Sequence, residues 1–179
     1  MSFDKDQIRP VVPEPEYDDP KEIYAFFGLA AYSVQLLEQG ILNLLVGVRI
    51  SAIEGPTWGN VRDLYNEGDR KTLGQLFKAL QKLVKFDTSI EEHLADALQK
   101  RNYLIHHFFV EHAKDLLSES GKRKMIDELC CIIGLFKMVD PQVDQLWHAI
   151  WGKYGFTKKR IERELKILKD KLKREEERT

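Results

Sequence analysis

The most constraining feature of this sequence is a long apolar segment near its start, from about residue 20 to residue 50. Asp19 followed by Pro20 is a typical helix start, because aspartate caps the first turn and proline fits the first helical position. The segment predicts one helix of roughly 45 Å at about 1.5 Å per residue. Apolar side chains lie almost all around it, so several neighbouring elements must cover it. Gln35 and Glu38 interrupt the apolar run, which favours a buried core helix over a membrane span.

The remainder of the chain also predicts helices, because apolar residues recur at intervals of three and four. The predicted helices cover about residues 73–84, 89–117, 121–139 and 141–153. Asp140 and Pro141 are predicted to end one helix and to start the next. Residues 51–71 contain several glycines and predict a loop with a short helix near residues 61–65. We therefore predict an all-α domain over residues 20–155, built as an antiparallel helical bundle.

The two ends of the chain differ from this domain. Residues 1–19 hold three prolines among acidic side chains, a composition typical of a flexible arm. Residues 156–179 predict a basic amphipathic helix. Its apolar residues follow the narrow spacing of a coiled coil: Ile161, Leu165, Leu168 and Leu172. Such a basic helix can follow a phosphate backbone, but a solvated helix that docks by its leucine seam is the favoured alternative.

The charge of the chain is nearly balanced, with 28 Lys and Arg against 29 Asp and Glu side chains. This argues against the global positive field of a general nucleic-acid binder, although an enzyme needs only local cations. Cys130 and Cys131 are adjacent, a poor arrangement for a bridge, and they predict reduced, buried thiols. No charged start followed by an apolar run marks a signal peptide, so we expect a cytoplasmic protein.

The residues most suited to chemistry lie in the predicted helix 89–117. Its predicted apolar face contains Leu94, Leu98, Ile105 and Phe108. Arg101 falls within that face and needs a partner there, for which Glu38 of the first apolar segment is predicted. Asn102 and His106 are four residues apart and project from adjacent turns of the helix. A guanidinium, an amide and an imidazole therefore lie close together beside one apolar seam.

The pattern Arg101-Asn102-x-x-x-His106 resembles the signature of HEPN domains, a family of small all-helical proteins. The run from Lys100 to Phe109 is similar to a bacterial subgroup that reads Lys-Arg-Asn-x-Leu-Ile-His-His-Phe-Phe, and the apolar stretch 30–38 looks like the first long helix of such domains. The resemblance covers roughly residues 20–117. It implies an HEPN-like bundle and a metal-independent endoribonuclease, of the kind found among toxins and phage-defence effectors.

Cleavage of RNA without a metal needs proton transfer and stabilisation of negative charge. Histidine can take the proton of the 2′-hydroxyl or protonate the leaving 5′-oxygen, and the planar fork of arginine matches phosphate oxygens. Arg101 and His106 lie about 140° apart around one helix at about 100° per residue, so a two-fold axis beside the motif would gather two copies of each. The resemblance implies such a composite site at a homodimer interface, and a product with a 2′,3′-cyclic phosphate.

Three lysines are the predicted RNA-binding cations: Lys78, Lys82 and Lys100. Lys78 and Lys82 share one face of the predicted helix 73–84, and an ordinary solvated face is the alternative. His107 is predicted to point outward, so we assign the chemistry to His106. His107 and Glu38 are placed beside the site as supporting residues.

No metal site and no cofactor are predicted. His107 and Glu111 form the best pair of metal ligands in the sequence, and two ligands do not make a site. His93, His112 and His148 are predicted to be ordinary surface or packing residues.

A second function stays open from the sequence, a non-catalytic HEPN-like helical dimer or adaptor that binds a protein partner. The balanced charge, the apolar seams and the leucine-lined C-terminal helix favour it, and a fold does not fix a function. In that case Arg101 pairs with Glu38, and His106 is hydrogen-bonded within a closed core. The partners expected under the two functions are a second copy, RNA, and a protein antitoxin or adaptor, with no membrane partner.

Overall fold

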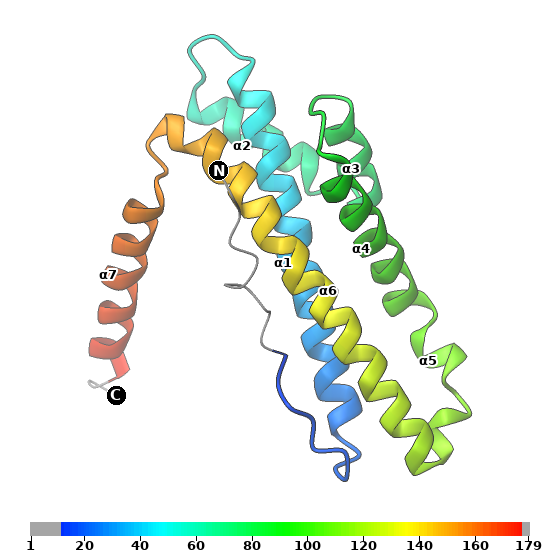
Figure 1. Cartoon of the computed structure of the whole chain (residues 1–179). Helices are drawn as coiled ribbons and strands as arrows, with labels where there is room; N and C mark the ends of the chain where they lie inside the picture. Colours follow the sequence, from blue (N-terminus) through cyan, green and yellow to red (C-terminus); the bar gives the residue numbers. More distant parts are fainter. Residues whose placement is uncertain (1–11, 177–179) are drawn as a thin grey trace.

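A computed structural model describes residues 12–176, and every regular element in that range is a helix (Figure 1). This confirms the predicted all-α class. Two long helices form the centre of the molecule and shorter ones lie around them. The elements are α1 (Glu22–Ser51), α2 (Trp58–Gly68), α3 (Leu73–Gln81), α4 (Thr88–His106), α5 (Phe108–Glu111), η1 (Asp115–Leu117), α6 (Glu119–Trp151), η2 (Gly152–Tyr154) and α7 (Lys158–Glu176).

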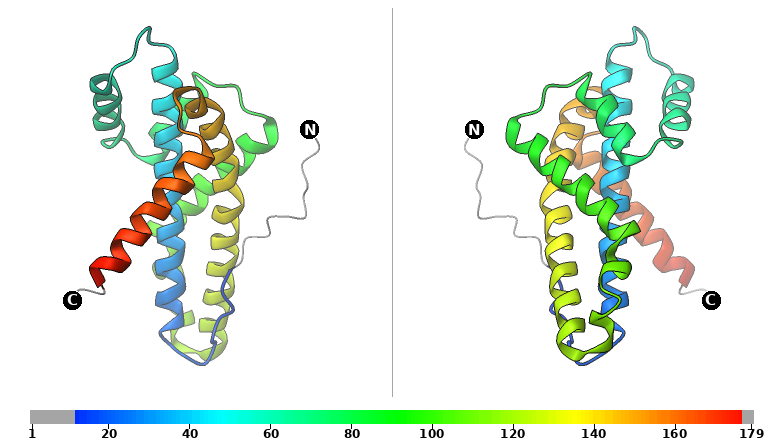
Figure 2. Two further views of the ribbon diagram at one scale, coloured as in Figure 1. Left: turned by 90° about the vertical axis from the view of Figure 1, so that its left-hand side faces the viewer. Right: turned by 90° about the vertical axis from the view of Figure 1, so that its right-hand side faces the viewer.

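The central pair consists of α1 and α6, which run side by side in the same direction (Figure 1 and Figure 2). They approach closely at Gly47, where an added Cβ would lie 2.5 Å from the indole nitrogen of Trp151. The same indole N–H donates to the main-chain oxygen of Asn43 at 3.0 Å. Within residues 12–176, α1 is the one helix whose length and composition match a membrane span, and half of its most apolar window is buried in this core.

The helix α6 continues through Pro141, so the prediction of two helices, 121–139 and 141–153, is wrong. Proline inside a helix removes one backbone hydrogen bond and costs about 3 kcal/mol. Val139 and Val143 lie on either side of the proline and are completely buried. Burial of the apolar face on both sides offsets the local cost, because tertiary packing supplies most of the stability of a helix.

The helix α4 runs antiparallel to α1 and α6 and ends at His106, so the prediction of one helix over residues 89–117 is wrong. The chain turns at His107, and α5 and η1 lead it to the start of α6. This turn lets Phe108 enter the core, where it is completely buried. Leu104 and Phe108 therefore occupy the core side, and Ile105, which was predicted to be buried, is exposed.

The segment between α1 and α4 contains more helix than the sequence predicted. Both α2 and α3 begin at a capping box, in which the side chains of two residues three positions apart satisfy each other's backbone N–H groups. The box of α3 pairs Thr72 with Gln75, which have the sequence spacing that this motif requires. The helix α2 extends beyond both ends of the short helix predicted near residues 61–65, and α3 ends at Gln81 instead of residue 84.

The two ends of the described chain differ in their contacts with the bundle. Residues 12–19 belong to the predicted arm, and Tyr17 there donates a hydrogen bond to Asp127 of α6 at 2.5 Å. Asp18 pairs with Arg123 of α6 at 2.9 Å. The remaining arm residues, 1–11, lie outside the described residues. In contrast, α7 extends away from the bundle in Figure 1, and none of its residues is buried.

Candidate functional site

The motif residues predicted to carry chemistry line one surface groove between α3 and the last turns of α4. The groove has a volume of about 430 Å³. Its lining residues are Thr72, Leu73, Gly74, Gln75, Lys78, Leu98, Arg101, Asn102 and His106. The fold of a single chain therefore brings Arg101 and His106 to the same hollow, together with Lys78 from another helix.

The start of α3 forms one wall of this groove. Leu73 and Leu76 are buried in the core and hold the helix in place. The backbone N–H of Gln75 is capped by the Thr72 hydroxyl at 3.4 Å, and the Gln75 amide oxygen accepts from the Thr72 N–H at 2.9 Å. The other N–H groups of the first turn have no carbonyl partner within the helix, and the helix dipole is positive at this end. This wall therefore favours an anion.

Arg101 crosses from α4 to α1, where the predicted ion pair with Glu38 is present. Its Nε donates to Glu38 Oε1 at 3.1 Å, and its Nη1 donates to Asn102 Oδ1 at 3.2 Å. Both members of the ion pair are partly exposed, at 21% for Arg101 and 29% for Glu38. The guanidinium has five N–H donors, so these two bonds position it and leave further donors for a ligand.

His106 ends α4 and is exposed at the rim of the groove. Its imidazole makes no hydrogen bond to the residues that the structure describes, and the ring centroid of His107 lies 6.3 Å away. The side chains of the groove lining include two cations, Lys78 and Arg101, and no carboxylate. An anionic group entering here would meet positive charge and a free imidazole.

The other predicted site residues lie outside the groove lining. Lys100 lies over the ring of Tyr103 at 5.3 Å, and Lys82 follows the end of α3. His107 caps the C-terminus of α4, where the chain turns. Among the predicted RNA-binding lysines, the structure thus brings only Lys78 to the motif.

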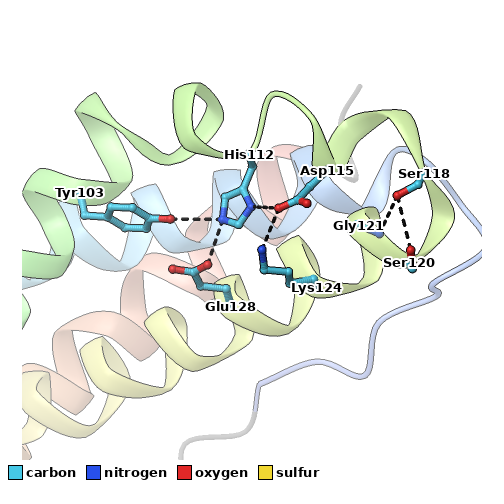
Figure 3. Close-up of polar contacts among 8 residues, drawn as sticks. All are labelled: Tyr103, His112, Asp115, Ser118, Ser120, Gly121, Lys124 and Glu128. Carbon is cyan, nitrogen blue, oxygen red and sulfur yellow. Dashed lines mark hydrogen bonds and ion pairs between the residues drawn. The ribbon is translucent and has the colours of Figure 1, made fainter.

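A second polar cluster, which no sequence pattern predicted, is centred on His112 (Figure 3). Predicted to be an ordinary residue, His112 is only 4% exposed and both of its ring nitrogens have partners. Nδ1 lies 2.6 Å from Asp115 Oδ2, and Nε2 lies 2.9 Å from Glu128 Oε2 and 3.2 Å from the Tyr103 hydroxyl. The cluster joins α4, the 3₁₀ turn and α6. The spacing of His112 and Asp115 was the available sequence signal, but the turn that directs them toward α6 was not predicted.

The cluster shifts the pKa of two of its members in opposite directions. The hydrogen bond from His112, together with Lys124 at 3.0 Å, lowers the pKa of Asp115. Burial and the nearby Glu128 carboxylate raise the pKa of Tyr103 well above its usual range, so this phenol stays protonated. Every polar group of the cluster is therefore matched by a neighbour, which is the arrangement of a structural network.

No group of three or more His, Cys, Asp or Glu side chains within residues 12–176 has the arrangement of a metal site. Comparisons of the chain with protein-family models, with curated proteins and with solved structures found no match. A function is therefore inferred from the groove and from its residues.

Proposed function

We propose that this chain is a metal-independent endoribonuclease of HEPN type that acts as a homodimer. The observation that carries the proposal is the groove in which Arg101, Asn102 and His106 meet Lys78 beside the start of α3. Two cations, an amide and an imidazole, with no carboxylate in the lining, suit a phosphodiester and the proton transfers that its cleavage needs. A toxin or phage-defence effector is the biological setting that this activity fits.

In this proposal each residue has one chemical role. Arg101 binds the phosphate oxygens, where its fork stabilises the charge of the transition state, and Glu38 keeps the guanidinium in place. Lys78 contacts a neighbouring phosphate as a point charge. His106 moves a proton at the 2′-hydroxyl or at the leaving 5′-oxygen. Because cleavage needs both transfers, the His106 of a second copy supplies the other one.

The surface beside the groove supports a dimer. The helix α1 contacts α4 at the Arg101–Glu38 pair, and it contacts α5 through Tyr24 and Phe109, whose ring centroids lie 6.0 Å apart. Three exposed apolar side chains lie on α1 and α4: Tyr32, Leu36 and Ile105. Ile105 is adjacent in sequence to His106 of the groove, and exposed apolar residues beside a polar site are typical of an interface.

The deciding experiment measures cleavage of varied RNAs by the full-length protein in the presence of a metal chelator. Wild-type protein is expected to produce fragments with 2′,3′-cyclic phosphate ends. Arg101→Ala and His106→Ala are each expected to lose activity by at least about 100-fold. His93→Ala, a histidine change on the same helix but away from the groove, is the matched control and should keep the activity.

A mixture of wild-type and His106→Ala protein tests the dimer within the same assay. A mixed dimer holds only one of the two histidines that the mechanism needs, so an excess of His106→Ala should reduce the activity of a fixed amount of wild-type protein, whereas the same excess of His93→Ala should not. Wild-type protein that is as inert as both variants on all RNAs tested would contradict the proposal.

One observation favours the second candidate, a non-catalytic helical adaptor. Arg101 is engaged by Glu38 and by Asn102 within a single chain, which a purely structural ion pair would also produce. Under this function RNA is not cleaved, and a protein partner binds to exposed apolar side chains such as Ile105.

A further inference from the structure

The C-terminal helix α7 has an apolar seam that none of the other described helices covers. Its members follow each other at spacings of four, three and four: Ile161, Leu165, Leu168 and Leu172. The three leucines are 50%, 52% and 49% exposed, and Figure 1 shows α7 apart from the bundle. Leucines aligned on one side of a solvated helix indicate a surface that is buried in an assembly.

The charged residues that flank the seam change sign halfway along it. Glu162 and Glu164 flank the first half, whereas Lys169 and Lys171 flank the second half. These four residues occupy the positions that face the neighbouring helix in a coiled coil. A second α7 that runs in the opposite direction therefore meets the opposite sign at each level.

We propose that α7 is an antiparallel coiled-coil arm that pairs with the α7 of a second copy of this chain. Leu165 of one copy packs against Leu168 of the other, and Ile161 packs against Leu172. The same alignment brings Glu162 beside Lys169 and Glu164 beside Lys171, in both symmetry-related positions. In this single register, each of the four apolar residues packs against an apolar residue of the other copy, and each of the four flanking charges lies beside an opposite charge.

The ends of the seam distinguish the antiparallel pair from a parallel one. Lys158 and Glu175 continue the seam spacing at its two ends. In the antiparallel register Lys158 lies opposite Glu175 of the other copy, an attractive pair. In a parallel pair, Lys158 would face the Lys158 of the other copy, and Glu175 would face the Glu175 of the other copy. Both contacts place like charges together.

This interface is distinct from the one in the proposed function and does not rest on it. An antiparallel pair of helices of 19 residues spans roughly 28 Å at about 1.5 Å per residue, and the two bundles attach at opposite ends. The motif groove lies on α3 and α4, so its variants leave α7 unchanged. Loss of RNA cleavage and loss of α7 pairing are therefore separate results.

Disulfide trapping in the full-length protein tests the register. Both native cysteines are changed to serine, one preparation carries Ile161→Cys and another carries Leu172→Cys. On mixing under mild oxidation, we expect a disulfide between the two preparations and little within either one. Disulfides formed only within each preparation would establish a parallel pair and overturn the antiparallel register.

A charge exchange tests whether a second copy is the occupant. Every flanking pair becomes repulsive when both cysteine preparations carry Lys169→Glu/Lys171→Glu. The same is true when both preparations carry Glu162→Lys/Glu164→Lys. Each is expected to reduce the trapped dimer by at least about fivefold at low salt. Combining one acidic preparation with one basic preparation should restore it. Lys159→Glu/Lys166→Glu, on the outer face of α7, is the control with an equal change of charge and should have no effect.

Two outcomes would overturn the pairing itself. One is that no disulfide forms between copies at any protein concentration, which would assign the seam to a different partner. The other is trapping that is equal in all charge variants, because the flanking residues would then not face each other.

Discussion

His106 and His112 lie six residues apart, yet they occupy opposite kinds of environment. His106 is exposed on a groove that contains Arg101 and Lys78, and the described part of the chain offers its ring no hydrogen bond. His112 is buried, and its two ring nitrogens contact Asp115, Glu128 and the hydroxyl of Tyr103. The turn at His107 separates the two environments by ending α4 between them.

The difference shows that polar groups in one short segment can have two roles. Groups with hydrogen-bond partners stabilise the fold, and groups without such partners are available to a ligand. A buried cluster in which each group has a partner stabilises the fold and offers nothing to a ligand. An exposed group of cations beside a free imidazole adds little stability and has donors left for an anion. Variants in the His112 cluster should therefore change the stability of the fold, and variants in the groove should change the binding or cleavage of RNA.

The largest effect is expected from removing the buried imidazole. His112→Ala leaves the Asp115 and Glu128 carboxylates without the imidazole that both contact, so the free energy of unfolding should fall by about 2–4 kcal/mol. His106→Ala removes an exposed side chain and should change it by no more than about 0.5 kcal/mol. Urea denaturation followed by circular dichroism measures both. Equal losses in the two variants would contradict the division between a structural and a functional histidine.

The pH dependence of stability should carry the signature of Asp115. Its pKa is lowered by the His112 hydrogen bond and by Lys124, so its carboxylate stabilises the fold above the unfolded-state pKa of about 3.9. This contribution disappears as the pH falls through the lower pKa of the folded state. The difference in melting temperature between wild type and Asp115→Asn should thus be constant near neutral pH and shrink below about pH 4. Asp96→Asn, an exposed change on α4, should show no such trend.

The smallest effect separates two lysines of one region. Lys78 lines the groove and Lys82 does not. Binding of single-stranded RNA with 2′-O-methyl sugars, which resists cleavage, can be measured by fluorescence anisotropy at several salt concentrations. Lys78→Ala should weaken binding about three- to tenfold and reduce the salt slope by about one, whereas Lys82→Ala should change neither. An equal response of both variants would assign the effect to general charge instead of the groove.

Residues with strong local signals were placed correctly from the sequence. The long apolar helix and the pairing of Arg101 with Glu38 are present. The failures arose where packing overrode local preference. Pro141 is a helix breaker in isolation, but buried valines on both sides keep α6 continuous. The turn at His107 contains no glycine or proline, so the sequence gives no local signal that the helix ends there.

The sequence by itself determined that this chain is helical, and which short stretch carries an arginine, an amide and an imidazole. These properties depend on spacing along one helix, which is fixed by the chain. Only the tertiary structure decided that Lys78 and the start of α3 complete the groove, and that His112 belongs to a closed network. Those outcomes depend on which distant surfaces bury each other, and burial is a property of the whole fold instead of any single segment.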